Sequence, residues 1–140
     1  MRFEDIQLPA FTKVIPDFAL NVCVIVPVKD EASNLRATLD SLYTQLHVNG
    51  NRIDYRSYEV LLLINNSTDE SLQIASDFKH NHPGFGLIIA DIVLPAELAN
   101  IGKVRRLLMD EAYRRFSVLK RNHGIIASID GDTVADQYWL

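Results

Sequence analysis

The sequence has 140 residues, of which 48% are hydrophobic and 23% charged, a composition typical of a globular domain with one core. Its formal net charge of -4 argues against nucleic acid as a partner, because phosphate-backbone binding requires a basic face. The single cysteine, Cys23, excludes an internal disulfide and a cysteine-based zinc cluster. No stretch approaches the roughly 18 apolar residues of a membrane-spanning helix. The polar first residues do not fit a secretory signal, so we expect a cytoplasmic protein with no transmembrane segment.

The first twenty residues contain Pro9 and Pro16 and show no clear periodicity, which predicts an N-terminal arm or a loosely packed segment over residues 1–20. Four nearly continuous apolar runs follow, which is typical of strands buried on both faces of a parallel sheet. They occupy residues 22–26, 60–64, 87–90 and 125–129.

Helical spacing of apolar residues separates these runs. It predicts helices beginning near Leu35, near Ser67 with capping-box spacing over residues 67–70, and near Asn100 with an end near Lys120. Alternating strands and helices indicate a three-layer α/β/α sandwich. Ligands of such sheets bind at the carboxyl ends of the strands, so the residues that follow each apolar run are the candidates for function.

Polar residues follow the first two apolar runs. Residues 27–31 contain a proline and charged side chains but no glycine, which disfavours a dinucleotide-binding loop and a P-loop and favours contacts to a base and ribose. Asn65 and Asn66 follow the second run, and their amides can bind a base edge or ribose hydroxyls. Ordinary helix capping explains either segment without a ligand, with Asp30 or Ser33 as the cap after the first run and Ser67 as the cap after the second.

Basic residues begin the third predicted helix. Asn100 is a good N-cap, which places Lys103, Arg105 and Arg106 in the first turns. Cations there meet the positive end of the helix macrodipole, an unfavourable interaction of ~0.3–1 kcal/mol each. A bound anion would reverse the sign, because free N–H groups and basic side chains would then act together. A solvated basic face is the alternative.

Two carboxylates, Asp130 and Asp132, follow the fourth run with only Gly131 between them. The glycine relaxes the backbone and lets both carboxylates approach one ion. Carboxylate oxygens are ligands of Mn2+ or Mg2+, which usually keep waters and bridge phosphates. The pair predicts a metal–diphosphate site. The position at a strand exit is the evidence, since an Asp-x-Asp triplet is expected about once by chance.

These segments together resemble the N-terminal half of family 2 glycosyltransferases, which have the GT-A fold. The similar segments are residues 24–31, 59–71, 100–103 and 129–133, in unbroken order over residues 21–140. The resemblance implies a mainly parallel, Rossmann-like sheet in which residues 21–140 form the nucleotide-sugar (donor) binding half of a GT-A domain. The implied activity is metal-dependent transfer of a sugar from a nucleotide-diphosphate sugar to an unknown acceptor.

Carried over by position, the resemblance places Pro27, Lys29 and Glu31 in the nucleoside pocket, with Asn65 and Asn66 beside them. This sequence departs from the family at both exits. Lysine and aspartate precede the glutamate where the family has an aromatic residue and asparagine, and amides replace acidic residues at the second exit. Because amides lack the charge-assisted bonds of carboxylates, uridine is not favoured as the base.

The resemblance also implies that Lys103 approaches the nucleotide, Asp130 the ribose or metal, and Asp132 the metal directly. The metal, Mn2+ or Mg2+, would neutralise the diphosphate leaving group as the sugar departs. The family's acceptor pocket and general base lie further along, so we expect the general base beyond Leu140. We therefore expect a chain truncated after the Asp-x-Asp motif and inactive alone. An apolar sheet edge left open would favour a homo-oligomer.

Two other functions are open on the sequence. A nucleotidyltransferase on a similar α/β sheet would require a glycine-rich, basic loop after the first strand, and residues 27–29 do not provide one. A non-catalytic α/β interaction module would have Asp130 and Asp132 as ordinary surface residues. Metal-dependent binding of a nucleoside diphosphate that is lost in Asp132→Ala would distinguish the glycosyltransferase from both.

Overall fold

The computed structural model describes residues 2–140, which form a four-stranded parallel sheet in the order β3-β2-β1-β4. The strands are β1 (Val22–Val28), β2 (Tyr58–Asn65), β3 (Leu87–Ile92) and β4 (Ile125–Ser128). The sequence therefore moves outward from β1 through β2 to β3, then returns across the sheet to place β4 on the other side of β1. This return creates a point between β1 and β4 at which the strand order reverses.

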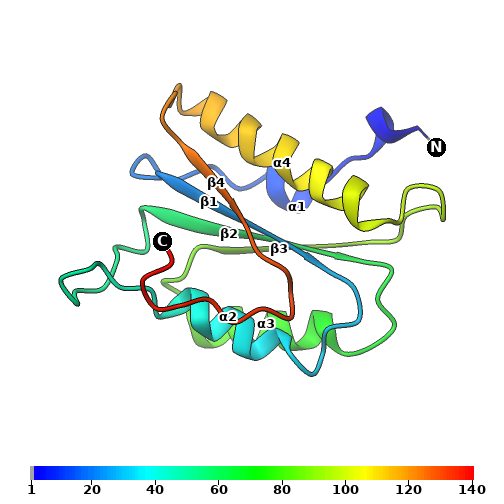
Figure 1. The fold of residues 1–140 in the computed structure, drawn as a ribbon. Helices are drawn as coiled ribbons and strands as arrows, with labels where there is room; N and C mark the ends of the chain where they lie inside the picture. Colours follow the sequence, from blue (N-terminus) through cyan, green and yellow to red (C-terminus); the bar gives the residue numbers. More distant parts are fainter. Residues whose placement is uncertain (1) are drawn as a thin grey trace.

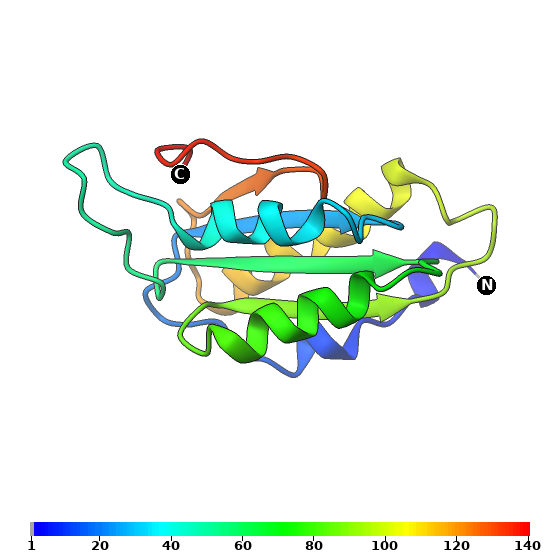
Figure 2. The same ribbon diagram turned by 90° about the horizontal axis from the view of Figure 1, so that it is seen from below.

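Helices cover both faces of the sheet (Figure 1). The helices α2 (Leu35–Tyr43) and α3 (Ser71–Asn81) lie on one face and contact each other, as Figure 2 also shows. The long α4 (Ile101–Val118) and the short α1 (Pro9–Thr12) lie on the other face. A 3-10 turn at Phe3–Asp5 precedes α1 in the sequence. The three-layer α/β/α sandwich predicted from the sequence is confirmed.

Each face of the sheet has its own apolar cluster. Alternate residues of β1 point to opposite faces, so Cys23 and Ile25 pack toward α1 and α4, whereas Val24 and Val26 pack toward α2 and α3. All four are completely buried, which explains why the run is continuously apolar rather than alternating. The helices contribute the stripes expected from their spacing, with Leu35, Leu39 and Leu42 from α2 and Val104, Leu108 and Ala112 from α4.

Two elements differ from the sequence prediction. The strand β4 lies at an edge of the sheet, where its only partner among residues 2–140 is β1, and its side chains are exposed or partly exposed, with Ile125 58% exposed. The expectation that it is buried on both faces was wrong. The helix α3 begins at Ser71 rather than near Ser67, and its N-cap residue Glu70 makes no capping hydrogen bond through its side chain. The hydroxyl of Ser67 instead accepts a hydrogen bond from the N–H of Asp30.

Part of the N-terminal segment packs against the sheet, whereas Ile15 and Phe18 within it are exposed; residue 1 lies outside the described range. Phe11 is fully buried against the face that α4 covers, and Leu8 and Leu20 belong to the same cluster. Because these side chains remove apolar surface from water, the segment stabilises the domain.

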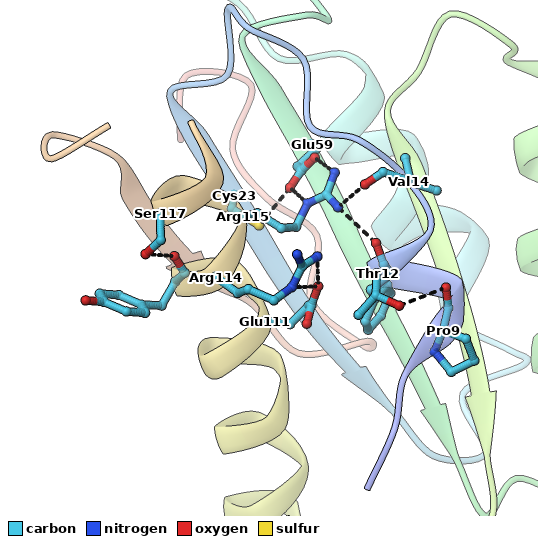
Figure 3. A network of polar contacts seen from close by, with 11 residues as sticks. Pro9, Thr12, Val14, Cys23, Glu59, Glu111, Arg114, Arg115 and Ser117 are labelled. Atoms are coloured by element: carbon cyan, nitrogen blue, oxygen red, sulfur yellow. Dashed lines mark hydrogen bonds and ion pairs between the residues drawn. The ribbon is translucent and has the colours of Figure 1, made fainter. Parts of the chain in front are cut away.

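A buried guanidinium fixes this segment to the sheet (Figure 3). Arg115 of α4 makes a two-bond ion pair with Glu59 of β2, at 2.5 Å from Nε to Oε2 and 2.7 Å from Nη2 to Oε1. Its Nη1 donates to the carbonyl oxygens of Phe11 and Val14, at 3.1 and 2.7 Å. The thiol of Cys23 donates to Glu59, and burial raises the pKa of this thiol far above its ordinary value. The network joins α4, β2 and the N-terminal segment, and it lies apart from the strand exits.

Candidate functional site

The carboxyl ends of β1 and β4 lie side by side at the point where the strand order reverses. Ile25 is paired with Ser128, and the N–H of Ile129 donates to the carbonyl of Ile25, so Asp130 follows directly beside the last residues of β1. Open α/β sheets bind ligands in the crevice outside the carboxyl ends of strands at such a reversal. The fold therefore brings together the first and fourth exits, which are a hundred residues apart in the sequence.

The loop after β4 is held tightly against the end of β1. Gly131 is buried, and a Cβ atom at this position would lie 3.0 Å from Cγ2 of Val28 and 3.5 Å from the carbonyl oxygen of Pro27. Its own carbonyl accepts a hydrogen bond of 2.9 Å from the hydroxyl of Thr38 in α2. A side chain at position 131 would crowd this contact unless Val28 shifted, so the close approach favours glycine. Both carboxylates that flank it, Asp130 and Asp132, are exposed.

Hydrogen bonds also join the exits of β1 and β2. Asp30 has a φ of 52°, a left-handed conformation that aspartate tolerates better than most residues, and its carboxylate accepts from the N–H of Thr68 at 2.7 Å. In return the N–H of Asp30 donates to Ser67. Neither residue is free to cap its own helix, so the capping role considered for them in the sequence is replaced by a contact between two loops.

A second pair of contacts reinforces this connection. The carboxylate of Asp69 accepts from the N–H of Ala32 and from Ser71, and the hydroxyl of Ser71 accepts from the N–H of Glu31. The hydrogen bond from Ser71 is the main cause that holds the pKa of Asp69 below its ordinary value. The backbone at Glu31 is thus fixed, while its carboxylate is partly exposed and accepts from Asn34.

The two predicted amides at the exit of β2 have different environments. Asn65 is 5% exposed, and its Nδ2 atom reaches only the Oδ1 of Asn66, at 3.4 Å. Asn66 has a φ of 52°, accepts from the N–H of Leu94 and donates to the Leu94 carbonyl. The side chain of Asn66 therefore fixes the loop after β3 to the exit of β2.

The remaining predicted residues lie around the same edge of the sheet. Pro27 is buried at the end of β1, whereas Lys29 is exposed beside it. Lys103 is held near the start of α4, where its Nζ donates to the carbonyl of Glu97 at 2.8 Å. Asn100 caps α4 as predicted, with its side chain accepting from the N–H of Lys103.

Arg105 was part of the predicted basic cluster but was not singled out as a site residue. In the structure its Nη2 lies 3.0 Å from Oδ1 of Asp130, which joins α4 to the exit of β4. Arg106 points elsewhere, with its guanidinium over the ring of Phe3 and 4.0 Å from Asp110. The sequence signal that could have identified Arg105 is its position one turn into a helix that begins at the same edge of the sheet.

The donor atoms at this edge fit a divalent cation that binds together with phosphate. Asp130 and Asp132 offer carboxylate oxygens, the ligands that Mg2+ and Mn2+ prefer. Within residues 2–140, no group of three histidine, cysteine, aspartate or glutamate side chains is placed to hold a metal ion. Two carboxylates suffice for an ion that completes its shell with water and substrate phosphates. Mg2+ usually binds in this way.

These features define an α/β domain with a candidate nucleotide site at the strand reversal. Residues 23–140 match the family model for glycosyl transferase family 2, and the chain therefore belongs to that family. The family predicted from the four polar segments is confirmed, which disfavours a nucleotidyltransferase.

A curated relative and two solved structures are similar to this chain. Glycosyltransferase AglE of Haloferax volcanii is 27% identical over 119 residues, which cover 85% of this chain and 33% of AglE. The crystal structure of S. aureus TarS 1–349 in complex with UDP has a TM-score of 0.63 at 21% identity and covers 85% of this chain and 29% of that one. The complex of TarS 1–349 with UDP-GlcNAc has a TM-score of 0.62 at 21% identity and covers 84% and 28%.

The two TarS structures are 21% identical to this chain, and at this level of identity the similarity supports the GT-A fold alone. The chain spans about a third of the length of AglE. No helix among residues 2–140 combines the length and apolar character needed to cross a membrane.

Proposed function

We propose that this domain binds the nucleotide-sugar donor of a family 2 glycosyltransferase at the carboxyl ends of β1, β2 and β4, in a manner that depends on Mn2+ or Mg2+. One observation supports the proposal above all others. The buried Gly131 places Asp130 and Asp132 against the end of β1, at the reversal of strand order. A metal–diphosphate site and a nucleoside site would therefore adjoin each other.

The residues at the end of β1 and β2 would bind the nucleoside. Pro27 and Glu31 lie beside the Asp-Gly-Asp loop, and the contacts of Asp30 and Asp69 fix the backbone between them. We assign the amide of Asn65 to the base or ribose. We assign Asn66 to this pocket chiefly because its side chain donates to the carbonyl of Leu94 and so positions the loop after β3. A prepositioned loop reduces the ordering cost of binding.

The charged residues would bind the diphosphate. Lys29 is exposed at the exit of β1, and Lys103 stands near the N-terminus of α4, where cations and free N–H groups favour an anion. We assign Asp132 to the metal and Asp130 to the metal or the ribose. The bound cation would neutralise charge that develops on the departing diphosphate. The transfer itself, the acceptor and the general base are proposals for the whole protein, and we place the base outside these 140 residues.

Thermal unfolding tests the proposal directly. We expect one of UDP, GDP, CDP and dTDP to raise the unfolding midpoint in the presence of Mn2+, and much less without it. A ligand at a hundred times its dissociation constant adds ~2.7 kcal/mol, enough for a shift of several degrees. The result would also identify the base.

Two variants test the role of the metal. Asp132→Asn should remove the Mn2+-dependent part of the shift, because a neutral amide is a weaker ligand for a hard cation. Asp136→Asn is the matched control, since it removes the same charge from the same segment, where the carboxylate of Asp136 accepts from the N–H of Tyr138. An unchanged Mn2+-dependent shift in Asp132→Asn contradicts the assignment. No shift with any nucleotide contradicts donor binding by this domain.

A further inference from the structure

Arg105 places a positive charge on one of the two carboxylates assigned to the metal. Its guanidinium lies 3.0 Å from Asp130, while no ion pair within residues 2–140 includes Asp132. The pair joins residues 25 positions apart, on two different elements, at the edge where the strands end. The basic residue is therefore placed by the tertiary fold rather than by spacing within α4.

A guanidinium and a divalent cation compete for the same carboxylate. Both carry positive charge, so a metal ion near Asp130 would be repelled by Arg105 and would have to displace it. The ion pair is exchangeable, because its side chains are 36% and 59% exposed and pairs of that exposure are weak. Without another ligand, the structure therefore opposes metal binding.

A diphosphate changes this balance in two ways. It supplies further oxygen ligands for the metal, which two carboxylates alone leave incomplete. It also offers Arg105 a new partner, since guanidinium groups bind phosphate oxygens through two parallel hydrogen bonds. The arginine can then leave Asp130 without losing a charge partner.

We propose that Arg105 couples metal binding to nucleotide binding: it occupies Asp130 in the free protein and moves to the diphosphate when the metal and nucleotide bind together. The inference rests on the proposed donor site and assigns Arg105 to the binding of the diphosphate within it. By linkage, the same coupling makes nucleotide affinity depend on the metal to an equal degree.

The first experiment measures Mn2+ binding without nucleotide, from the electron paramagnetic resonance signal of free Mn2+. Arg105→Gln should bind Mn2+ about 3- to 10-fold more tightly than wild type, because the competing charge is gone. Arg106→Gln is the matched control on the neighbouring residue of the same helix, directed toward Phe3 and Asp110. The Mn2+ affinity of Arg106→Gln should differ from that of wild type by less than about twofold, since salt screens charges at longer range. Equal effects of the two substitutions would overturn the proposal.

The second experiment repeats the titration with the nucleoside diphosphate that most stabilises the wild type. The ratio of Mn2+ affinities with and without nucleotide measures the coupling. We expect Arg105→Gln to reduce this ratio at least about threefold and Arg106→Gln to leave it unchanged. An unchanged ratio in Arg105→Gln overturns the inference while leaving the donor site intact. If wild type binds no nucleoside diphosphate with Mn2+, the proposed function fails and the coupling fails with it, even where Arg105→Gln tightens Mn2+ alone.

Discussion

Replacing Arg115 by methionine tests how the N-terminal segment contributes to stability. The substitution keeps a long apolar side chain but leaves Glu59 as a buried carboxylate, in a pair whose side chains are only 1% and 7% exposed. Removing one partner of a buried ion pair typically costs ~3–5 kcal/mol. The carbonyls of Phe11 and Val14 also lose one hydrogen bond each, at about 0.5–1.5 kcal/mol per bond.

The combined loss is a large part of the stability of a domain this size, which is typically 5–15 kcal/mol. We therefore expect Arg115→Met to lower the urea concentration at the unfolding midpoint. We also expect it to lower the melting temperature by well over 10 °C, at about 3–4 °C for each kcal/mol of stability lost. Trypsin should also cleave faster after Lys13, because the neighbouring segment loses its attachment at Val14.

Two comparisons separate the buried charge from other effects. Arg56→Met removes a guanidinium that precedes β2 and pairs with Asp17 of the N-terminal segment; because this pair is exposed, the midpoint should be nearly unchanged. The double variant Glu59→Leu with Arg115→Met should recover much of the lost stability, because no charge then remains buried. If Arg115→Met does not fold, Arg115→Lys keeps the charge with fewer bonds and should show an intermediate loss. An effect of Arg115→Met no larger than that of Arg56→Met would refute the reasoning.

Three further predictions concern the exits and the thiol. Gly131→Ala should weaken metal-dependent nucleotide binding more than it lowers the melting temperature, by crowding Val28, whereas Gly84→Ala, with open space around it, should change neither. The pKa of Asp69 is lower in the folded protein than its ordinary value of 3.8, so its contribution to stability is complete above that pH and lost as the pH falls below it. Asp69→Asn should flatten the acid limb of the unfolding midpoint plotted against pH, and an unchanged limb would contradict this. Cys23 should resist alkylation at pH 8 until urea unfolds the chain, because burial raises the pKa of its thiol; rapid reaction in the native protein would show that the thiol is accessible.

The sequence was sufficient to predict the fold class because the two patterns that indicate it, apolar runs and helical spacing, are local. Runs such as residues 60–64 are continuously apolar only where both faces of a strand are covered, and helical spacing lies between them. The cap of α4 at Asn100 was predicted for the same reason, since its hydrogen bond to Lys103 spans three residues. The position of the polar clusters at strand exits was local as well.

Tertiary structure decided which of those polar residues act on one another. The sequence suggested that Asp30 or Ser67 caps its own helix, and the fold instead joins them across two loops. It suggested that β4 is fully buried, and the strand order leaves it at an edge. Hydrogen bonds and partners across the sheet depend on which strands adjoin, and apolar periodicity contains no information on that order.

The sequence by itself determined the elements, the family and the edge of the sheet at which a ligand would bind. The tertiary structure decided that Arg105 meets Asp130, that Gly131 fits against the end of β1, and that Arg115 holds the N-terminal segment. The physical reason is one of range. Periodicity and capping act within a few residues, whereas each of these contacts joins residues that are 25 to 104 positions apart. Such residues meet only after the fold has placed β4 beside β1 and packed α4 across the sheet.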